Sequence, residues 1–228
     1  MCSFLQINRR ADGAGLWRIV VWWTFIIFLM RCCFVLLYRF RRSGMEHVPR
    51  TGPIIYVANH QSNFDPPLVG SVVCDRPFLG IARKGLFSSK LLSLFLHQFG
   101  AIEIKRGESD IKAIRLAVNE LSAGRCVLMF PEGSRSPDGN IHEFKRGFWL
   151  LLRKSKATVL PIGIEGSYNV WKIGSNPKLR GYIEAIAGPP IEASDLLAMG
   201  EEKGTAFVRS TIEKLCQQCQ LNIDQRSK

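Results

Sequence analysis

The sequence IIYVANHQSNFDPP, residues 54–67, places a histidine and an aspartate on a turn between two regular elements. Its first five residues are apolar and rich in β-branched side chains, which is typical of a buried strand. Pro66 and Pro67 can begin a helix but cannot continue a strand. His60 and Asp65 therefore lie on a strand-to-helix turn, a place where side chains often face a ligand.

Strand-like and helix-like segments alternate along the rest of the chain. This alternation predicts an α/β fold with a mixed, largely parallel central sheet flanked by helices. The predicted strands cover residues 54–58, 78–82, 101–104, 126–130, 158–165 and 182–187, and the predicted helices cover 67–73, 90–99, 109–123, 144–153 and 205–220.

The N-terminal part of the chain has a different composition. Residues 19–38 are mostly apolar, with Arg31 as their only charge, and a run of that length matches the hydrocarbon thickness of a bilayer. We expect residues 1–42 to form a membrane anchor, either one transmembrane helix or a monotopic pair of short helices meeting near Arg31. Residues 43–228 then form the catalytic domain. We expect a protein associated with the inner or cytoplasmic membrane, or its equivalent, with that domain on the cytoplasmic side.

The formal net charge is +12 and the pI is about 9.7. This surplus favours an anionic partner, which the charge alone leaves open among nucleic acid, anionic lipid and a phosphorylated substrate. The seven cysteines are odd in number and irregularly spaced, which indicates reduced thiols. Cys216 and Cys219 form a single CxxC pair on a predicted helix, and this is more typical of a packed helical face than of a zinc site.

Cations follow several of the predicted strands, and ligands of open α/β sheets bind beyond the carboxyl ends of the strands. The cations are Arg83, Lys84, Lys105, Arg106, Arg135, Lys145 and Arg146. Taken alone, the turn is equally consistent with Asp65 capping a helix beside a surface histidine. The converging cations favour a site instead.

Such a site would combine a base, a carboxylate and an anion-binding surface. Imidazole accepts a proton near neutral pH, and a carboxylate on its other nitrogen fixes the tautomer. The sequence contains no GxSxG motif and no serine or cysteine clearly placed on a nucleophile turn. His60 is therefore expected to activate a hydroxyl of the substrate.

Several sequence blocks resemble those of one enzyme family. NHQSNFD, residues 59–65, resembles the NHxxxxD signature of the glycerolipid acyltransferases. GAIEIKR (100–106), FPEGSRS (130–136) and VLPIGI (159–164) resemble further blocks of that superfamily, in the same order. The sequence thus resembles the 1-acylglycerol-3-phosphate acyltransferase (lysophosphatidate acyltransferase) family, which implies a glycerol-3-phosphate acyltransferase-like fold.

The resemblance implies that His60, oriented by Asp65, takes a proton from an acceptor hydroxyl. The alkoxide then attacks the thioester of an acyl-CoA or acyl-carrier protein, and the family needs no metal or other cofactor. The expected partners are membrane lipids and the acyl donor, with no nucleic acid. The resemblance implies that one group of residues binds the acceptor: Arg106, Lys105, Glu132, Gly133, Ser134 and Arg135. Within this group, Glu132 would orient Arg135 or the acceptor's hydroxyls. A second group is implied to bind the acyl donor or to support the structure: Asn59, Lys84, Lys145, Arg146 and Pro161.

The first choice of acceptor is 1-acylglycerol 3-phosphate, which gives phosphatidic acid. Lys105 stands where many relatives carry an acidic or small residue before the arginine, so another lysolipid, such as a lyso-aminolipid, stays open as the acceptor. A basic membrane-surface protein without catalysis is a further alternative, although it leaves the NHQSNFD and FPEGSRS blocks unexplained. A thioesterase or lipase is disfavoured because no nucleophile motif is present.

Overall fold

The strand that precedes the His/Asp turn lies at the centre of the molecule. In a computed structural model, which describes residues 16–74, 76–83, 102–104 and 110–228, β2 spans Ile54–Ala58 and all five of its residues are buried. Its alternate side chains enter two different cores. Ile54, Tyr56 and Ala58 belong to one, whereas Ile55 and Val57 belong to the other. A strand buried on both faces explains its uninterrupted apolar sequence.

Seven strands of the described residues form one sheet in the order β1-β7-β6-β2-β5-β3-β4. Every pairing is parallel except that between β6 and β7. The mixed, largely parallel sheet predicted from the sequence is therefore confirmed. The strands are β1 (Arg41–Ser43), β2, β3 (Phe78–Arg83), β4 (Ile102–Ile104), β5 (Cys126–Met129), β6 (Thr158–Glu165) and β7 (Glu184–Ala187).

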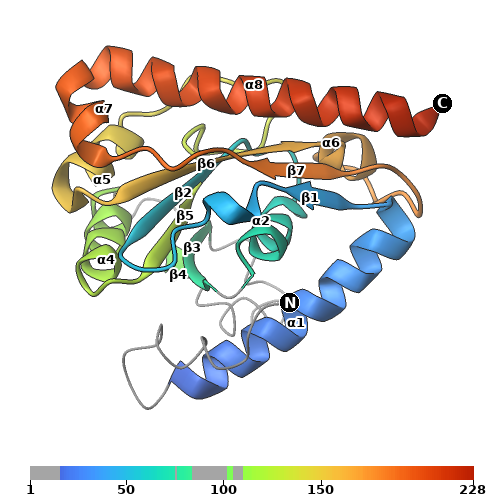
Figure 1. The fold of residues 1–228 in the computed structure, drawn as a ribbon, viewed down its shortest axis with the longest axis horizontal. Coiled ribbons are helices and arrows are strands. Elements are labelled where there is room, and N and C mark those ends of the chain that lie inside the picture. Colours follow the sequence, from blue (N-terminus) through green and yellow to red (C-terminus); the bar gives the residue numbers. More distant parts are fainter. Residues whose placement is uncertain (1–15, 75, 84–101, 105–109) are drawn as a thin grey trace.

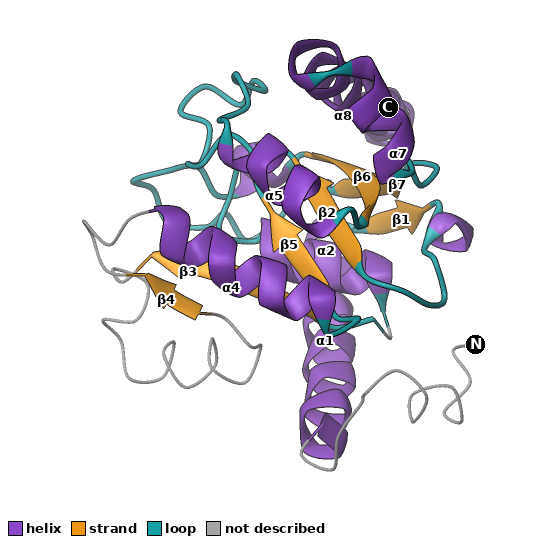
Figure 2. Ribbon diagram, turned by 90° about the vertical axis from the view of Figure 1, so that its left-hand side faces the viewer, coloured by secondary structure: helices purple, strands orange, loops and turns teal. Residues whose placement is uncertain are grey.

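Helices cover both faces of the sheet (Figures 1 and 2). On one face, α1 and α2 enclose a core that contains Trp23, Phe34 and Leu68. On the other, α4, α5, α7 and α8 enclose a core that contains Leu121, Leu152 and Ile212. The helices are α1 (Leu16–Tyr38), α2 (Asp65–Val73), α4 (Asp110–Ser122), α5 (Gly147–Ser155), α6 (Ser167–Val170), α7 (Ala193–Met199) and α8 (Glu201–Ser227), with a short 3₁₀ helix, η2, at Met45–His47.

The segment expected to be a membrane anchor is a single helix. α1 runs from Leu16 to Tyr38 without a break at Arg31, unlike the alternative of two short helices meeting there. Within the part of the chain that the structure describes, none of the helices has the length and apolar character needed to cross a membrane. β1 pairs in parallel with β7, and the boundary predicted after Arg42 falls inside this strand.

The remaining differences from the predicted elements lie mostly at their ends. α2 begins at Asp65 rather than Pro67, and α5 begins at Gly147 rather than at residue 144. β7 is shorter than predicted, and α8 is longer at both ends. β1 and α7 were not predicted. The helix predicted over residues 90–99 lies outside the described residues.

Candidate active site

The turn after β2 is held together by Asp65, the first residue of α2. Its side chain is fully buried, and one oxygen, Oδ2, accepts hydrogen bonds from the backbone N–H groups of Gln61 at 2.6 Å and Ser62 at 2.7 Å. A carboxylate at a helix N-terminus is also stabilised by the helix dipole. The turn therefore closes around this carboxylate, which fixes the position of the residue just before Gln61.

That preceding residue is His60, and its ring has contacts on two sides. Nδ1 lies 2.8 Å from Asp65 Oδ2, and the ring stacks on Phe130 with centroids 3.9 Å apart and planes 14° apart. The backbone carbonyl of His60 accepts a 2.6 Å hydrogen bond from Ser136. The side chain is 18% exposed, and Nε2 has no hydrogen-bond partner among the described residues. The arrangement leaves Nε2 available to accept a proton from a ligand.

Glu132 forms its hydrogen bonds with backbone amides of the protein. Its side chain is buried, and its two oxygens accept from backbone amides, Oε1 from His60 at 2.9 Å and Oε2 from His142 at 3.0 Å. Burial raises the pKa of this carboxyl, while the hydrogen bonds from His142 and His60 act in the opposite direction. Both oxygens thus accept hydrogen bonds within the protein, and Glu132 holds the backbone of His60. Its expected role toward Arg135 or an acceptor hydroxyl stays a prediction.

The rest of the FPEGSRS block lies at the exposed end of β5. Gly133 has a φ of +72°, a conformation that favours glycine, and a Cβ there would come within 2.7 Å of Lys145 Nζ. Lys145 therefore lies against the block. Gly133 and Ser134 are exposed, and Arg135 is half-buried. This edge carries positive charge beside the residues that hold His60.

Two of the residues expected in supporting roles serve the sheet. The side chain of Asn59 donates to the carbonyl of Ile164 at 2.8 Å and accepts from its amide at 2.9 Å, which joins the ends of β2 and β6. Pro161 is buried within β6 opposite Val57. Arg146 is exposed just before α5.

Three predicted cations cannot be placed. Lys84, Lys105 and Arg106 lie outside the described residues. The phosphate-binding role that the family resemblance gives to Arg106 therefore stays a prediction.

Other residues of the site were missed by the sequence reasoning. Gln61 is buried, and its amide nitrogen donates to Gly139 O at 2.8 Å and lies 3.3 Å from Glu165 Oε1. Its amide oxygen accepts from Ser167 Oγ at 3.3 Å. Gln61 thus ties the turn to two other segments. The one signal in the sequence was Glu165 itself, a carboxylate that ends an otherwise apolar strand.

Glu165 is a buried carboxyl beside the turn whose pKa is raised. Burial raises its pKa to about 7, while hydrogen bonds from Gln61 and the backbone of Gly166 act against this rise. The negative charge of Asp65 raises it further. A carboxyl that titrates near neutral pH thus lies in contact with the His/Asp turn.

Aromatic side chains connect the turn to α1. Phe64 packs against Phe34 and Tyr38 of α1, with ring centroids 5.3 and 5.5 Å apart, and against Trp171, 4.8 Å away. Ser62 Oγ donates to the carbonyl of Trp171 at 3.0 Å. The residues between His60 and Asp65 therefore contact both the N-terminal helix and the segment after α6.

Comparisons with known proteins find named acyltransferases among the relatives of this chain. The chain is 30% identical over 161 residues to a chloroplastic 1-acyl-sn-glycerol-3-phosphate acyltransferase of Arabidopsis thaliana, covering 69% of this chain and 45% of the relative. It is 27% identical to an enzyme of the same name from Pseudomonas aeruginosa, covering 87% of this chain and 79% of the relative. A lyso-ornithine lipid O-acyltransferase of P. aeruginosa is 28% identical and covers 72% of this chain and 61% of the relative.

The fold has a solved counterpart. The crystal structure of the 1-acyl-sn-glycerophosphate acyltransferase PlsC of Thermotoga maritima superposes with a TM-score of 0.71 at 22% identity and covers 94% of each chain. The chain spans about half the length of the first curated relatives it matches. A family model described as Acyltransferase matches residues 39–165, more than half of the chain and including the whole His/Asp turn. The chain belongs to the acyltransferase family.

Proposed function

We propose that this chain transfers a fatty acyl group from an acyl thioester to the free hydroxyl of a lysophospholipid, most simply 1-acylglycerol 3-phosphate, giving phosphatidic acid. The observation that carries this proposal is the 2.8 Å contact between His60 Nδ1 and a buried Asp65 carboxylate. It leaves Nε2 of a partly exposed ring without a hydrogen-bond partner among the described residues. The names of the relatives support the choice of substrate.

In the proposed reaction, His60 Nε2 accepts the proton of the acceptor's hydroxyl as that oxygen attacks the thioester carbonyl. Asp65 stabilises the imidazolium that forms and keeps the proton of Nδ1 in place. The tetrahedral intermediate then expels the thiolate, which takes the proton back from Nε2 and leaves as the free thiol. General-base catalysis of this kind contributes about 10²–10⁴-fold. Positioning of the two substrates supplies much of the remainder.

The acceptor's hydroxyl is the nucleophile in this scheme, and no acyl-enzyme forms. Two nearby hydroxyls already have partners: Ser62 Oγ donates to Trp171 O, and Ser136 Oγ donates to Asp138. Within the described part of the chain, no side-chain hydroxyl or thiol forms a hydrogen bond with the His60 ring. We propose that acyl-CoA or acyl-carrier protein is the only co-substrate and that neither a metal nor another cofactor takes part.

The headgroup of the acceptor is the finer part of the proposal. Arg135 and Lys145 are cations at the exposed edge of the site, and an arginine guanidinium binds phosphate by two parallel hydrogen bonds. A second acceptor class, a lyso-aminolipid, is favoured only by the similarity to the lyso-ornithine lipid acyltransferase. An equimolar mixture of lysolipids given to one enzyme distinguishes these acceptors directly.

We propose further that the protein is associated with the inner or cytoplasmic membrane, or its equivalent, with the site on the cytoplasmic side. The outward side chains of α1 support this, because Phe25, Phe28 and Leu36 are 57, 62 and 81% exposed. Apolar patches of this kind mark contacts with membranes or other proteins. Both the acceptor and the product of the proposed reaction are lipids of the bilayer.

The test is mass spectrometry of the products when the purified protein receives lysolipids and an acyl-CoA. We expect phosphatidic acid from the parent and a loss of about 10²–10⁴-fold in turnover for His60→Ala. His142→Ala is the matched control, because His142 is also paired with an aspartate but is exposed. Substantial turnover by a folded His60→Ala protein overturns the assignment of the base. Thioester hydrolysis without an acceptor would instead indicate a thioesterase.

A further inference from the structure

The loop after Trp171 combines exposed aliphatic and cationic side chains. We call residues 172–181 the basic loop. Leu179 is 81% exposed and Ile173 is 43% exposed, and Lys172, Lys178 and Arg180 are exposed beside them. No acidic residue occurs between Trp171 and Ile183. An isolated exposed leucine is ordinary, but one placed between two cations in a segment without acids has the composition of a membrane-surface contact.

The basic loop lies beside the C-terminal end of α1. Directly after this loop, the amide of Ile183 donates to the carbonyl of Tyr38 at 3.0 Å, and Arg39 contacts both the hydroxyl and the ring face of Tyr182. Figure 1 shows the connection between α6 and β7 running next to the end of α1. Val35, Leu36 and Leu37, in the last turn of that helix, are 44, 81 and 44% exposed. Two exposed apolar segments far apart in the sequence therefore adjoin one another.

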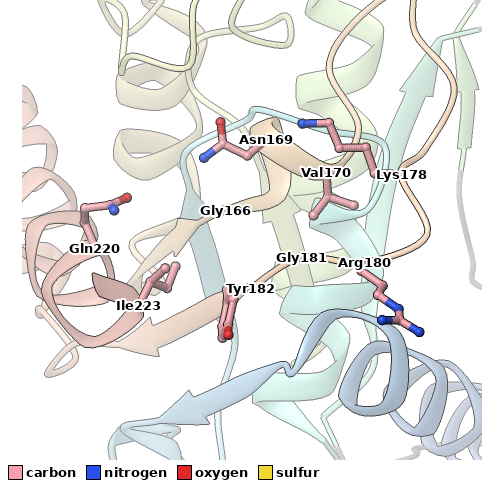
Figure 3. A pocket seen from close by; sticks show the side chains of 9 residues that line it. All are labelled: Gly166, Asn169, Val170, Lys178, Arg180, Gly181, Tyr182, Gln220 and Ile223. Carbon is pink, nitrogen blue, oxygen red and sulfur yellow. The ribbon is translucent and has the colours of Figure 1, made fainter. Parts of the chain in front are cut away.

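Cations surround this junction. A pocket of about 200 Å³ lies between α6, the basic loop and α8. Figure 3 shows Arg180 pointing away from this pocket and Lys178 running along its edge toward Asn169. A second depression, of about 410 Å³, lies on the other side of Tyr182 and is lined by Arg39 and Arg41. The exposed leucines thus stand among positive charges contributed by the basic loop and by the α1–β1 connection.

The junction is also joined to the site. Trp171, which immediately precedes the basic loop, packs on Phe64 at 4.8 Å and accepts a hydrogen bond from Ser62. Ser62 and Phe64 lie between His60 and Asp65 in the sequence. If the basic loop bound to a surface, that surface would therefore lie at a fixed position relative to the His/Asp turn.

We propose that the basic loop docks on an anionic lipid bilayer, with Leu179 entering the interface and Lys172, Lys178 and Arg180 contacting lipid phosphates. Together with the outward face of α1, it forms a two-point contact that presents the His/Asp turn to the bilayer. A nucleic acid fits this surface poorly, because the cations alternate with aliphatic residues and adjoin an apolar helix face. The proposal goes beyond acyl transfer, because docking requires neither substrate.

The experiment measures partition of the full chain onto two kinds of vesicle, one of phosphatidylcholine alone and one also containing phosphatidylglycerol. Each basic residue near an anionic surface strengthens binding about fivefold. We therefore expect Lys178→Gln/Arg180→Gln to lower partition onto the phosphatidylglycerol vesicles about 25-fold and to leave partition onto neutral vesicles nearly unchanged. Leu179→Ser should lower partition onto both by about tenfold, because an apolar side chain is lost.

The matched control is Arg153→Gln/Lys154→Gln, which removes the same charge from exposed positions at the end of α5. α5 covers the opposite face of the sheet from α1, and the field of a charged bilayer falls off within about one Debye length. If both double variants lost partition onto the phosphatidylglycerol vesicles equally, only net charge would matter and the proposal would be overturned. It would also be overturned if Lys178→Gln/Arg180→Gln showed no loss of partition. Circular dichroism and thermal unfolding establish that each variant is folded.

Turnover of a water-soluble, short-chain lysophosphatidate separates docking from catalysis. The loop variants should retain this turnover, because none of the substituted residues contacts the His/Asp turn. If no variant and no parent protein transfers acyl groups, the proposed function fails, yet the partition measurements still decide the docking surface. If Lys178→Gln/Arg180→Gln instead lost turnover of the water-soluble substrate while its partition onto vesicles stayed unchanged, Lys178 and Arg180 would belong to the substrate site.

Discussion

At the scale of single residues, Asp65 has both a structural and a chemical role. One of its oxygens, Oδ2, faces two backbone amides and His60 Nδ1, all within 2.8 Å. The other, Oδ1, is buried without a hydrogen-bond partner among the described residues. Three donors converging on one oxygen explain why the turn needs a carboxylate and not merely an acceptor. The same charge that closes the turn stabilises a proton on His60 during the proposed reaction.

Asp65→Asn separates these roles. The amide oxygen can still accept from the backbone, but the charge is lost and the His60 tautomer is no longer enforced. We expect turnover to fall by about 10³–10⁴-fold, as when a carboxylate that orients a catalytic histidine is neutralised, with a much smaller effect on the melting temperature. Asp138→Asn, which alters an exposed aspartate bonded to His142, serves as the control. Equal turnover in both variants would remove Asp65 from the mechanism.

Glu165 makes stability depend on pH. It faces the Gln61 amide, the backbone N–H of Gly166, the Cys216 thiol of α8 and the Asp65 carboxylate. Burial raises its pKa from an ordinary 4.5 to about 7, so between these values the folded state holds a proton that the unfolded state has released. The contribution of this proton to the stability of the folded state is complete below about pH 4.5 and is lost as the pH rises through 7.

Glu165→Gln removes this pH dependence, because an amide does not titrate. The free energy of unfolding of the parent should fall relative to that of the variant by about 3 kcal/mol between pH 4.5 and 7.5. Urea unfolding across this range measures the difference. Glu143→Gln, at an exposed carboxyl in the loop before α5, should follow the parent curve. If the free energies of unfolding of the parent and of Glu165→Gln differed by the same amount at every pH, Glu165 would titrate alike in the folded and unfolded states.

At the scale of elements, the close packing of α8 on β6 depends on a small residue. A Cβ on Gly163 would lie 2.6 Å from Leu215 Cβ and 2.8 Å from the backbone nitrogen of Cys216. A backbone atom cannot rotate away, so the helix would have to move. In the same contact, the thiol of Cys219 lies 3.6 Å from the carbonyl of Gly163. The CxxC pair thus serves packing, as its helical spacing indicated.

Gly163→Ala should therefore lower the free energy of unfolding by about 1–3 kcal/mol, a typical cost of overpacking. Gly80→Ala is the matched control in another strand, because a Cβ there meets no atom within 4 Å, and it should be neutral or slightly stabilising. Thermal unfolding of the two variants makes the comparison. Similar melting temperatures for both would mean that α8 does not pack tightly on β6.

The elements also show how far the sequence alone could lead. β2 and β6 have the predicted bounds, because both are long apolar runs ended by polar residues. β1 was missed because Arg41–Ser43 is polar and becomes a strand only by pairing with β7. The His/Asp pair followed from its place on a strand-to-helix turn. The role of Glu132 could not be predicted, because its partners are backbone amides at distant positions, which leave no pattern in the sequence.

At the scale of the whole molecule, α1 belongs to the fold as well as to the proposed membrane contact. Trp23, Ile27, Phe34 and Tyr38 are buried in the core that also contains residues of β2 and α2. Side chains on the other side of the helix, such as Phe28 and Leu36, are exposed. A helix that is apolar all round is explained when one face packs on the domain and the other on lipid.

This dual role predicts opposite effects for two aromatic substitutions in α1. Trp23 is 1% exposed, stacks edge-on against Phe78 at 4.9 Å and donates to the carbonyl of Cys74 at 2.9 Å. Trp23→Ala should therefore lower the free energy of unfolding by about 3–5 kcal/mol. Phe28, at 62% exposure, should change it by less than about 0.5 kcal/mol when replaced by alanine but should weaken binding to vesicles. Thermal unfolding in detergent and vesicle partition separate the two effects. If both variants melt like the parent and bind vesicles equally weakly, α1 is a detachable anchor and the catalytic fold begins after it.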